Sequence, residues 1–356
     1  MKISAVYVED EVREHPRTRA ILARLHKIPH ISCTSWSEVF NRRSQNFRLQ
    51  KRRPGLILAW KRDGYVLPTP EGYGISRGAA GDSNHYFSHL LNCPYDCRYC
   101  FLQGMYRSAH YVLFVNYERF FDAVESTVGR TGPGWFFSGY DADSLALERL
   151  TGFASDALTA FRQIEGAHLE LRTKSTQIGS LLEVEPFDRA VVAWSFTPDS
   201  VSGAVEHGVP SVTRRINALR RVAERGWSIG LRFDPVLACD DFENAYRDLF
   251  DQILDAIPDE RLHSVSLGPF RLPTAFFRRL EKLHPDDPLV AGGPWQARDG
   301  MVSYPPELEQ RWVGFVLDEL RRRIGEDRLF PCGVTAATGP TSSPIPEMEL
   351  QSQSSV

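Results

Sequence analysis

Residues 93–101 read Cys-Pro-Tyr-Asp-Cys-Arg-Tyr-Cys-Phe, which places three cysteines within eight positions in a C-x3-C-x2-C spacing. The whole chain has six cysteines in 356 residues, and the other three are scattered. Secreted domains that depend on disulfides are denser in cysteine and space it along the chain. A tight group such as this one is typical of metal binding in a reducing compartment, so we expect a metal centre and a cytoplasmic location.

Two kinds of metal centre are compatible with three thiols on one loop. Zinc normally takes four ligands in a tetrahedron, and His85, His89 and His110 are the nearby candidates for the fourth ligand. An iron–sulfur cube with three protein thiolates instead leaves one iron atom open to a substrate or cofactor. The iron–sulfur centre is favoured, because a zinc loop does not account for the pattern of strands and helices that surrounds the cysteines.

That pattern is an alternation of short apolar strands with helical segments. The candidate strands are residues 84–91, 134–140, 168–173, 190–196, 228–237 and 263–269. The candidate helices are residues 117–129, 143–165, 176–184, 211–225, 241–257 and 273–283. Six βα units in series predict an α/β fold whose parallel sheet is closed or partly closed as a barrel. The cysteine loop follows the first strand, and ligands of such barrels bind at the C-terminal ends of the strands.

The composition divides the chain into three predicted parts. Residues 1–80 predict a small basic α/β module, and residues 84–332 predict the barrel with a last helix at about 306–324. Residues 335–356 are rich in Ser, Thr and Pro and lack aromatic residues, Lys and Arg, so we expect a disordered tail. The chain has no run of about 18 uncharged apolar residues and no secretory signal at its start, so we expect no membrane span.

Positive charge gathers near the start of the chain, although the formal net charge is only −3. Residues 1–92 contain 15 Lys and Arg against 8 Asp and Glu, and residues 39–62 contain no acidic residue. A basic patch with interleaved aromatic residues can hold phosphates and stack on bases, so Arg52, Arg53 and Lys61 are candidate nucleic-acid contacts. The alternative is a solvated basic surface whose aromatic residues lie in the core.

The cysteine loop after a first strand resembles the radical S-adenosylmethionine (radical SAM) superfamily. In that superfamily three cysteines hold a [4Fe–4S] cluster, and the open iron binds the amino and carboxylate groups of S-adenosylmethionine. One electron, from a donor such as flavodoxin or ferredoxin, then cleaves the cofactor to a 5′-deoxyadenosyl radical. The resemblance implies that Cys93, Cys97 and Cys100 bind the cluster and that Tyr99 packs near the adenine.

Over about residues 4–332 the sequence resembles one branch of this superfamily, the spore photoproduct lyase family. The matching segments include Cys-Phe-Leu-Gln at 100–103, Trp-Ser-Phe at 194–196 and the run from Arg215 to Gly226. Members of this branch repair a thymine adduct in DNA, so the resemblance implies DNA as the substrate. A modified nucleotide, RNA or a peptide would suit the same radical chemistry, and a non-catalytic nucleic-acid-binding protein with structural zinc is the competing hypothesis. The sequence leaves the oligomeric state open.

Four further residues are candidates for binding the cofactor. The resemblance implies that Lys174 contacts the carboxylate of S-adenosylmethionine and that Ser195 holds the cofactor. Asp234 and Asp141 also follow or end predicted strands, where they can reach a ligand. The structural alternatives are a surface lysine, a core hydroxyl and, for Asp141, the cap of the following helix.

The sequence departs from this family at the residues that return a hydrogen atom to the substrate. The family uses a cysteine after the second barrel strand, where Ser138 is the matching residue, and a tyrosine where this chain has Phe101. A serine O–H bond is far stronger than a thiol S–H bond, so Ser138 is a poor donor to a carbon radical. Tyr140 and Cys239 are the remaining candidates, and a buried structural thiol is the alternative for Cys239.

Overall fold

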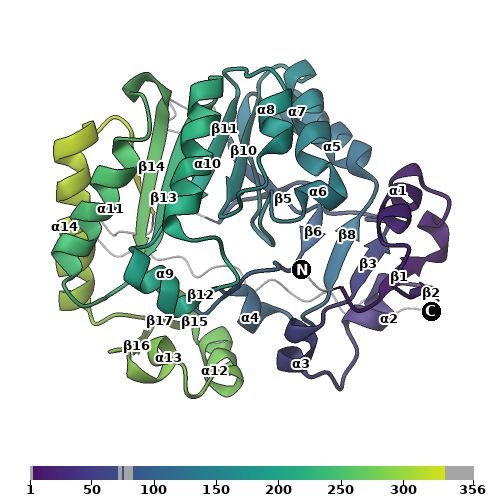
Figure 1. Cartoon of the computed structure of the whole chain (residues 1–356), viewed down its shortest axis with the longest axis horizontal. Coiled ribbons are helices and arrows are strands. Elements are labelled where there is room, and N and C mark those ends of the chain that lie inside the picture. Colours follow the sequence, from purple (N-terminus) through teal and green to yellow (C-terminus); the bar gives the residue numbers. More distant parts are fainter. Residues whose placement is uncertain (1–2, 71–73, 76–82, 333–356) are drawn as a thin grey trace.

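The computed structural model describes residues 3–70, 74–75 and 83–332. The tail predicted at residues 335–356 lies outside these ranges. Two sheets and the helices packed on them make up most of the described chain (Figure 1). No helix of the described residues is both long enough and apolar enough to cross a membrane.

The larger sheet has eight strands in the order β18-β14-β13-β11-β10-β9-β5-β4. Its strands are β4 (Leu67–Pro68), β5 (Ser83–Phe87), β9 (Gly134–Ser138), β10 (Ala167–Thr173), β11 (Ala190–Ser195), β13 (Ser228–Val236), β14 (Leu262–Pro269) and β18 (Leu329–Pro331). From β5 to β18 all neighbours are parallel, and β4 pairs with β5 in the antiparallel sense. All six predicted strands are present in a curled, open sheet, which confirms the partial barrel.

Helices cover the outer face of this sheet (Figure 1). The helices that follow its strands are α5 (Tyr117–Thr131), α6 (Glu148–Thr151), α7 (Phe153–Gln163), α8 (Gly179–Glu183), α9 (Asp199–Val205), α10 (Val212–Arg225), α11 (Phe242–Leu254), α12 (Thr274–Leu283), α13 (Pro288–Gly292) and α14 (Pro306–Ile324). The helix predicted at 143–165 is two helices, because Gly152 between α6 and α7 adopts a left-handed conformation with φ of 63°. In α10, Ser211 caps the first turn and Gly226 ends the helix, as its sequence predicts.

Side chains of the curled sheet alternate between two faces, as the pleat of a strand requires. On β13, Ile229, Leu231 and Phe233 join the main hydrophobic core beneath the helices. Arg232 points to the opposite, concave face, where its Nη2 donates to Glu170 of β10 at 2.6 Å. We call this concave face the lumen.

A smaller sheet, in the order β2-β1-β3-β8-β6, forms the N-terminal part of the molecule. Its strands are β1 (Val6–Glu9), β2 (His30–Cys33), β3 (Leu56–Ala59), β6 (Leu90–Leu91) and β8 (Tyr111–Phe114), and its helices are α1 (Pro16–Arg24), α2 (Trp36–Phe40) and α3 (Phe47–Arg52). Strands β6 and β8 come from the segment that the sequence assigned to the barrel. The N-terminal sheet is therefore completed by chain that lies beyond residue 80.

Two further small sheets lie near the C-terminal ends of the barrel strands. One is the ribbon of β7 (Asp96–Cys97) and β12 (Glu206–His207), and the other contains β15 (Arg271–Pro273), β16 (Gln296–Arg298) and β17 (Met301–Ser303). Helix α4 (Leu102–Met105) packs against α12 in the same region. Figure 1 shows α4, α9, α12 and these strands gathered on one side of the barrel.

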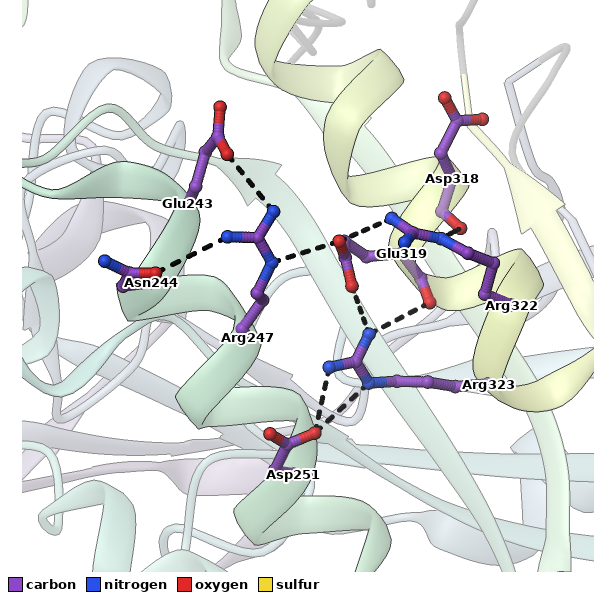
Figure 2. Close-up of polar contacts among 8 residues, drawn as sticks. All are labelled: Glu243, Asn244, Arg247, Asp251, Asp318, Glu319, Arg322 and Arg323. Atoms are coloured by element: carbon purple, nitrogen blue, oxygen red, sulfur yellow. Dashed lines mark hydrogen bonds and ion pairs between the residues drawn. The ribbon is translucent and has the colours of Figure 1, made fainter.

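A network of ion pairs fixes α14 against α11 (Figure 2). The carboxylate of Glu319, only 3% exposed, accepts hydrogen bonds from Arg247 of α11 and from Arg322 and Arg323 of α14. Arg323 also reaches back to Asp251 of α11 at 2.9 Å. One buried carboxylate thus joins three guanidinium groups from two helices.

We expect Glu319→Gln to destabilise the protein by about 1–3 kcal/mol, because it removes the charge that three arginines share at a buried position. Urea unfolding followed by circular dichroism measures this loss. The control is Asp318→Asn, whose exposed carboxylate faces only Arg321 at 3.5 Å and whose loss we expect to cost within about 0.5 kcal/mol. Equal losses for the two variants would contradict the role given to Glu319.

Candidate functional site

The cysteine loop lies across the C-terminal ends of the barrel strands and is held from two sides. On one side β7 pairs antiparallel with β12, so that Cys97 lies opposite Glu206. On the other side Lys51 of α3 donates hydrogen bonds of 2.7 Å to the carbonyl oxygens of Cys93 and Tyr95. The N-terminal sheet and the barrel therefore both fix the backbone that carries the three thiols.

The three thiols of the loop are free, and Cys97 and Cys100 lie with Tyr99 in one hydrophobic cluster. Burial raises the pKa of Cys93, Cys97 and Cys100. For Cys97, burial is the largest influence on the pKa. Lys174 lowers this pKa, whereas charges on Cys100 and Cys93 raise it. Binding to a metal centre would have to offset this effect of burial, because only the thiolate form of cysteine is a metal ligand.

A single zinc ion fits this arrangement poorly. Within the described ranges, no group of three or more His, Cys, Asp or Glu side chains is arranged to hold a metal ion. The three histidines named as zinc candidates are engaged elsewhere: His110 accepts from the backbone N–H of Gly55 at 2.8 Å, and His89 stacks on Phe153 at 3.4 Å. His85 stacks on Phe136 at 5.2 Å. These contacts leave none of the three histidines placed as a fourth ligand beside the cysteine thiols.

A buried carboxylate, Glu206, joins the loop to the barrel. Its side chain accepts hydrogen bonds from the hydroxyl of Tyr99 and, at 2.7 Å, from Arg215. Both members of the Glu206–Arg215 pair are fully buried. The ammonium group of Lys174 lies 3.9 Å from Glu206 and 5.5 Å from the centre of the Tyr99 ring. The structure thus brings together two predicted cofactor residues around a carboxylate that the sequence analysis did not identify.

The end of β10 is fixed by a second carboxylate that the sequence analysis missed. Asp143 accepts from the backbone N–H of Lys174 at 2.6 Å and from the Thr173 hydroxyl at 2.7 Å. Ser195, the last residue of β11, is buried on the luminal face, and its carbonyl accepts a hydrogen bond of 2.9 Å from Arg215. Lys174 and Ser195 therefore lie at adjacent strand ends, as expected for two residues that bind one ligand.

Further charged residues line the lumen beside Lys174 and Ser195. Burial alone would raise the pKa of Glu170, but Arg232 and Arg172 bring it down to about 2, so the carboxylate is ionised. Asp234 also lies on the luminal side of β13, and burial raises its pKa although Arg271 and Arg172 oppose the shift. The predicted residue Asp234 therefore faces the same space as Lys174.

Asp141 lies in a separate polar cluster at the ends of β5 and β9. Its Oδ2 accepts from Ser88 at 2.5 Å, and its Oδ1 is buried with no hydrogen-bond partner among the described residues. Burial raises its pKa, while Ser88, Tyr106 and Lys61 lower it. Lys61 is half-buried, lies 4.9 Å from the centre of the Phe114 ring, and belongs to this cluster rather than to an exposed surface.

The two other predicted nucleic-acid contacts, Arg52 and Arg53, are exposed at the end of α3. The preceding lysine, Lys51, instead donates hydrogen bonds to backbone carbonyls of the cysteine loop. The basic segment therefore divides into an exposed part and a part that supports the loop.

The candidate hydrogen donors lie in different places. Ser138 accepts a hydrogen bond of 3.1 Å from Ser144, behind the sheet. Tyr140 packs against luminal aromatic residues and lies 5.5 Å from Phe101. Cys239 is half-buried near Ser200, where burial raises its pKa to about 11.

The chain was compared with known proteins. A family model described as spore photoproduct lyase matches residues 83–277. The spore photoproduct lyase of Bacillus subtilis (strain 168) is 26% identical over 292 residues, which cover 79% of this chain and 82% of that protein. That of Geobacillus sp. (strain Y412MC61) is 24% identical over 164 residues, which cover 45% of this chain and 48% of that protein.

Solved structures of spore photoproduct lyases share the fold. One is a complex with dinucleoside spore photoproduct, and it superposes with a TM-score of 0.75 at 17% identity. A mutant with bound AdoMet and dinucleoside spore photoproduct gives the same TM-score and identity. Both comparisons cover 92% of this chain and 98% of the other.

We expect Glu206→Ala to cost about 3–5 kcal/mol in the free energy of unfolding, because it leaves the buried guanidinium of Arg215 without its carboxylate. The matched control is Glu185→Ala, which removes an exposed Glu–Arg pair with Arg225 and should leave the free energy of unfolding almost unchanged. Urea unfolding of both variants checks this. A loss at Glu206 no larger than that at Glu185 would show that the buried pair does not hold the loop.

Proposed function

Because the chain belongs to the spore photoproduct lyase family, we propose that it is a radical SAM enzyme that repairs a DNA lesion of the spore photoproduct type. The observation that carries this proposal is the group of three free thiols at the C-terminal strand ends, beside Lys174 and Tyr99. In this proposal Cys93, Cys97 and Cys100 hold a [4Fe–4S] cluster. With S-adenosylmethionine bound, the cluster supplies the electron that cleaves the cofactor to a 5′-deoxyadenosyl radical.

The residues around the thiols have separate tasks in this proposal. Lys174 neutralises the carboxylate of the cofactor, since its side chain is only 15% exposed and its ammonium group lies over the ring of Tyr99 in the cysteine loop. Tyr99 offers its ring to the adenine, and Glu206 fixes that ring through the tyrosine hydroxyl. Ser195 offers a hydroxyl at the neighbouring strand end. Asp234 faces the lumen, where it can accept hydrogen bonds from the ribose or the substrate.

Glu206 acts on the cofactor site through other residues. Its carboxylate forms ion pairs with both Arg215 and Lys174. Because Arg215 already neutralises Glu206, the ammonium group of Lys174 can also pair with the carboxylate of the cofactor. Lys51 supports the same loop through backbone carbonyls. Both are positioning residues, because neither reaches the reacting atoms.

DNA is the proposed substrate class. A base inside a duplex cannot reach the end of a barrel, so the lesion must leave the stack before it reacts. Arg52 and Arg53 are exposed on α3, beside the helix residue Lys51 that holds the cysteine loop, so phosphates bound there would lie near the site. Lys61 lies deeper, beside Asp141, and would contact the lesion rather than the flanking backbone.

The reaction also needs an electron. A low-potential one-electron donor such as flavodoxin or ferredoxin is the proposed partner. We propose that the protein works in the cytoplasm, since all six of its cysteines are free, as thiols are in a reducing compartment.

Anaerobic reconstitution with iron and sulfide should give a brown protein that forms 5′-deoxyadenosine from S-adenosylmethionine and a reductant. Cys97→Ala should abolish both the chromophore and the product, because a thiolate ligand is lost. Cys33→Ala, which changes a buried thiol of the N-terminal sheet, should keep both. One zinc per chain with no bound iron, or full product formation by Cys97→Ala, would sink the proposal.

DNA binding by α3 has its own test. The double variant Arg52→Ala, Arg53→Ala should bind irradiated DNA more weakly, and the slope of log K against log salt should become shallower by about 2. Arg220→Ala, Arg221→Ala on the outer helix α10 is the charge-matched control, since both arginines are exposed there. Fluorescence anisotropy at several salt concentrations measures the slopes, and identical slopes for the two variants would remove α3 from the DNA surface.

A further inference from the structure

The two faces of strand β9 decide which side chains can reach a reacting group in the lumen. Trp135 and Phe137 lie in a luminal cluster with Tyr86 of β5. Phe136, between them, packs on Phe161 of α7 behind the sheet. By the same alternation Ser138 points away from the lumen, and Ser144 already hydrogen-bonds its hydroxyl.

The chain turns back toward the lumen directly after this strand. Gly139 adopts φ of 90°, and a Cβ there would lie 2.8 Å from the carbonyl oxygen of Arg172, so a glycine is required at this position. The turn brings Tyr140 onto the luminal cluster, where its ring stacks on Tyr86 with 4.3 Å between ring centres and an interplanar angle of 28°. Its other neighbour is Phe101, at 5.5 Å, the residue after Cys100.

Tyr140 therefore connects the luminal wall with the loop that carries the thiols. A tyrosine O–H bond is much weaker than a serine O–H bond, because the phenoxyl radical is delocalised over the ring. A phenol can therefore quench a carbon radical, whereas serine and water cannot.

From this geometry we propose that Tyr140 is the hydrogen-atom donor to carbon radicals formed at the mouth of the lumen, with Tyr86 as the residue that positions its ring. The inference rests on the proposed function. In the step, the O–H bond of Tyr140 breaks homolytically and a C–H bond forms on the radical. The phenoxyl radical that remains returns to the phenol with one electron from the low-potential donor and one proton.

Two thiols are the alternatives. Cys239 is half-buried beside Ser200, and it packs against the hydrophobic cluster that contains Cys97 and Tyr99, as Cys100 and Phe101 also do. Cys332 follows β18 and is buried, two residues after Phe330, which packs against the luminal cluster. Cys239 and Cys332 are therefore the rival donors that an experiment must separate from Tyr140.

Deuterium transfer in D2O identifies the donor, because the hydrogens of phenols and thiols exchange with solvent and those on carbon do not. The reconstituted protein is given reductant and S-adenosylmethionine, with and without dinucleoside spore photoproduct. Mass spectrometry then measures deuterium per molecule in the 5′-deoxyadenosine formed without substrate and in the thymine product formed with it. We expect deuterium in both for the unmodified protein.

Tyr140→Phe should lose the deuterium from both molecules, whereas Cys239→Ala and Cys332→Ala should keep it. Tyr86→Phe, which retains the stacked ring, should also keep it, and Tyr86→Leu should lower it. In samples frozen during turnover, electron paramagnetic resonance should show a phenoxyl signal that narrows with ring-deuterated tyrosine and is absent from Tyr140→Phe.

Unchanged deuterium in Tyr140→Phe, or its loss in Cys239→Ala or Cys332→Ala instead, would overturn the assignment. If the dinucleoside is not converted, the deuterium content of the 5′-deoxyadenosine formed without substrate is enough to test whether Tyr140 is the donor. Absence of 5′-deoxyadenosine from every variant would mean that the proposed function fails, and the donor assignment with it. A failure of the donor assignment alone appears as 5′-deoxyadenosine whose deuterium content does not depend on residue 140.

Discussion

The fully buried pair of Glu206 and Arg215 is the interaction on which the candidate site depends. A carboxylate at this position would be costly without a partner, and the guanidinium group of Arg215 supplies one at 2.7 Å. The remaining oxygen of Glu206 is then available to Tyr99 and Lys174. Since β7 pairs with β12 beside this carboxylate, the geometry of the cysteine loop and that of the lysine are set by the same group.

The second constraint is the alternation of side chains in the curled sheet. It assigns Glu170 and Arg232 to the lumen and their strand neighbours to the core behind the sheet, so the same strands supply both a buried ion pair and an apolar core. The same rule separates Ser138 from Tyr140, because one ends the strand on the outer face and the other follows a glycine turn. Moving a reactive side chain by one or two positions in such a segment therefore changes whether that side chain can reach the lumen.

Much of the fold could be predicted, because its signals are local. Six apolar strands and helices with clear ends, such as the one between Ser211 and Gly226, follow from periodicity and capping. The boundary of the N-terminal sheet could not, since β8 joins it through pairing with β3, a contact across about fifty residues that no local pattern records. The zinc alternative likewise depended on where three histidines point, which only packing decides.

Within the site, the cysteine spacing is a local motif and was sufficient to locate the loop. Glu206 and Asp143 were missed, because a single carboxylate on a short connection has no signature in the sequence until the fold brings its partners to it. Lys51 was included in a basic patch, although its ammonium group donates to two backbone carbonyls of the cysteine loop. These residues act through tertiary contacts, and the sequence shows only their charge.

We propose that the three thiols hold an iron–sulfur cluster whose open iron binds S-adenosylmethionine beside Lys174. Pulsed electron paramagnetic resonance of the reduced protein, with the methionyl nitrogen of the cofactor labelled with 15N, tests it most directly. The account predicts a hyperfine coupling between the cluster and that nitrogen. A reduced cluster that shows no coupling to the bound cofactor would contradict it.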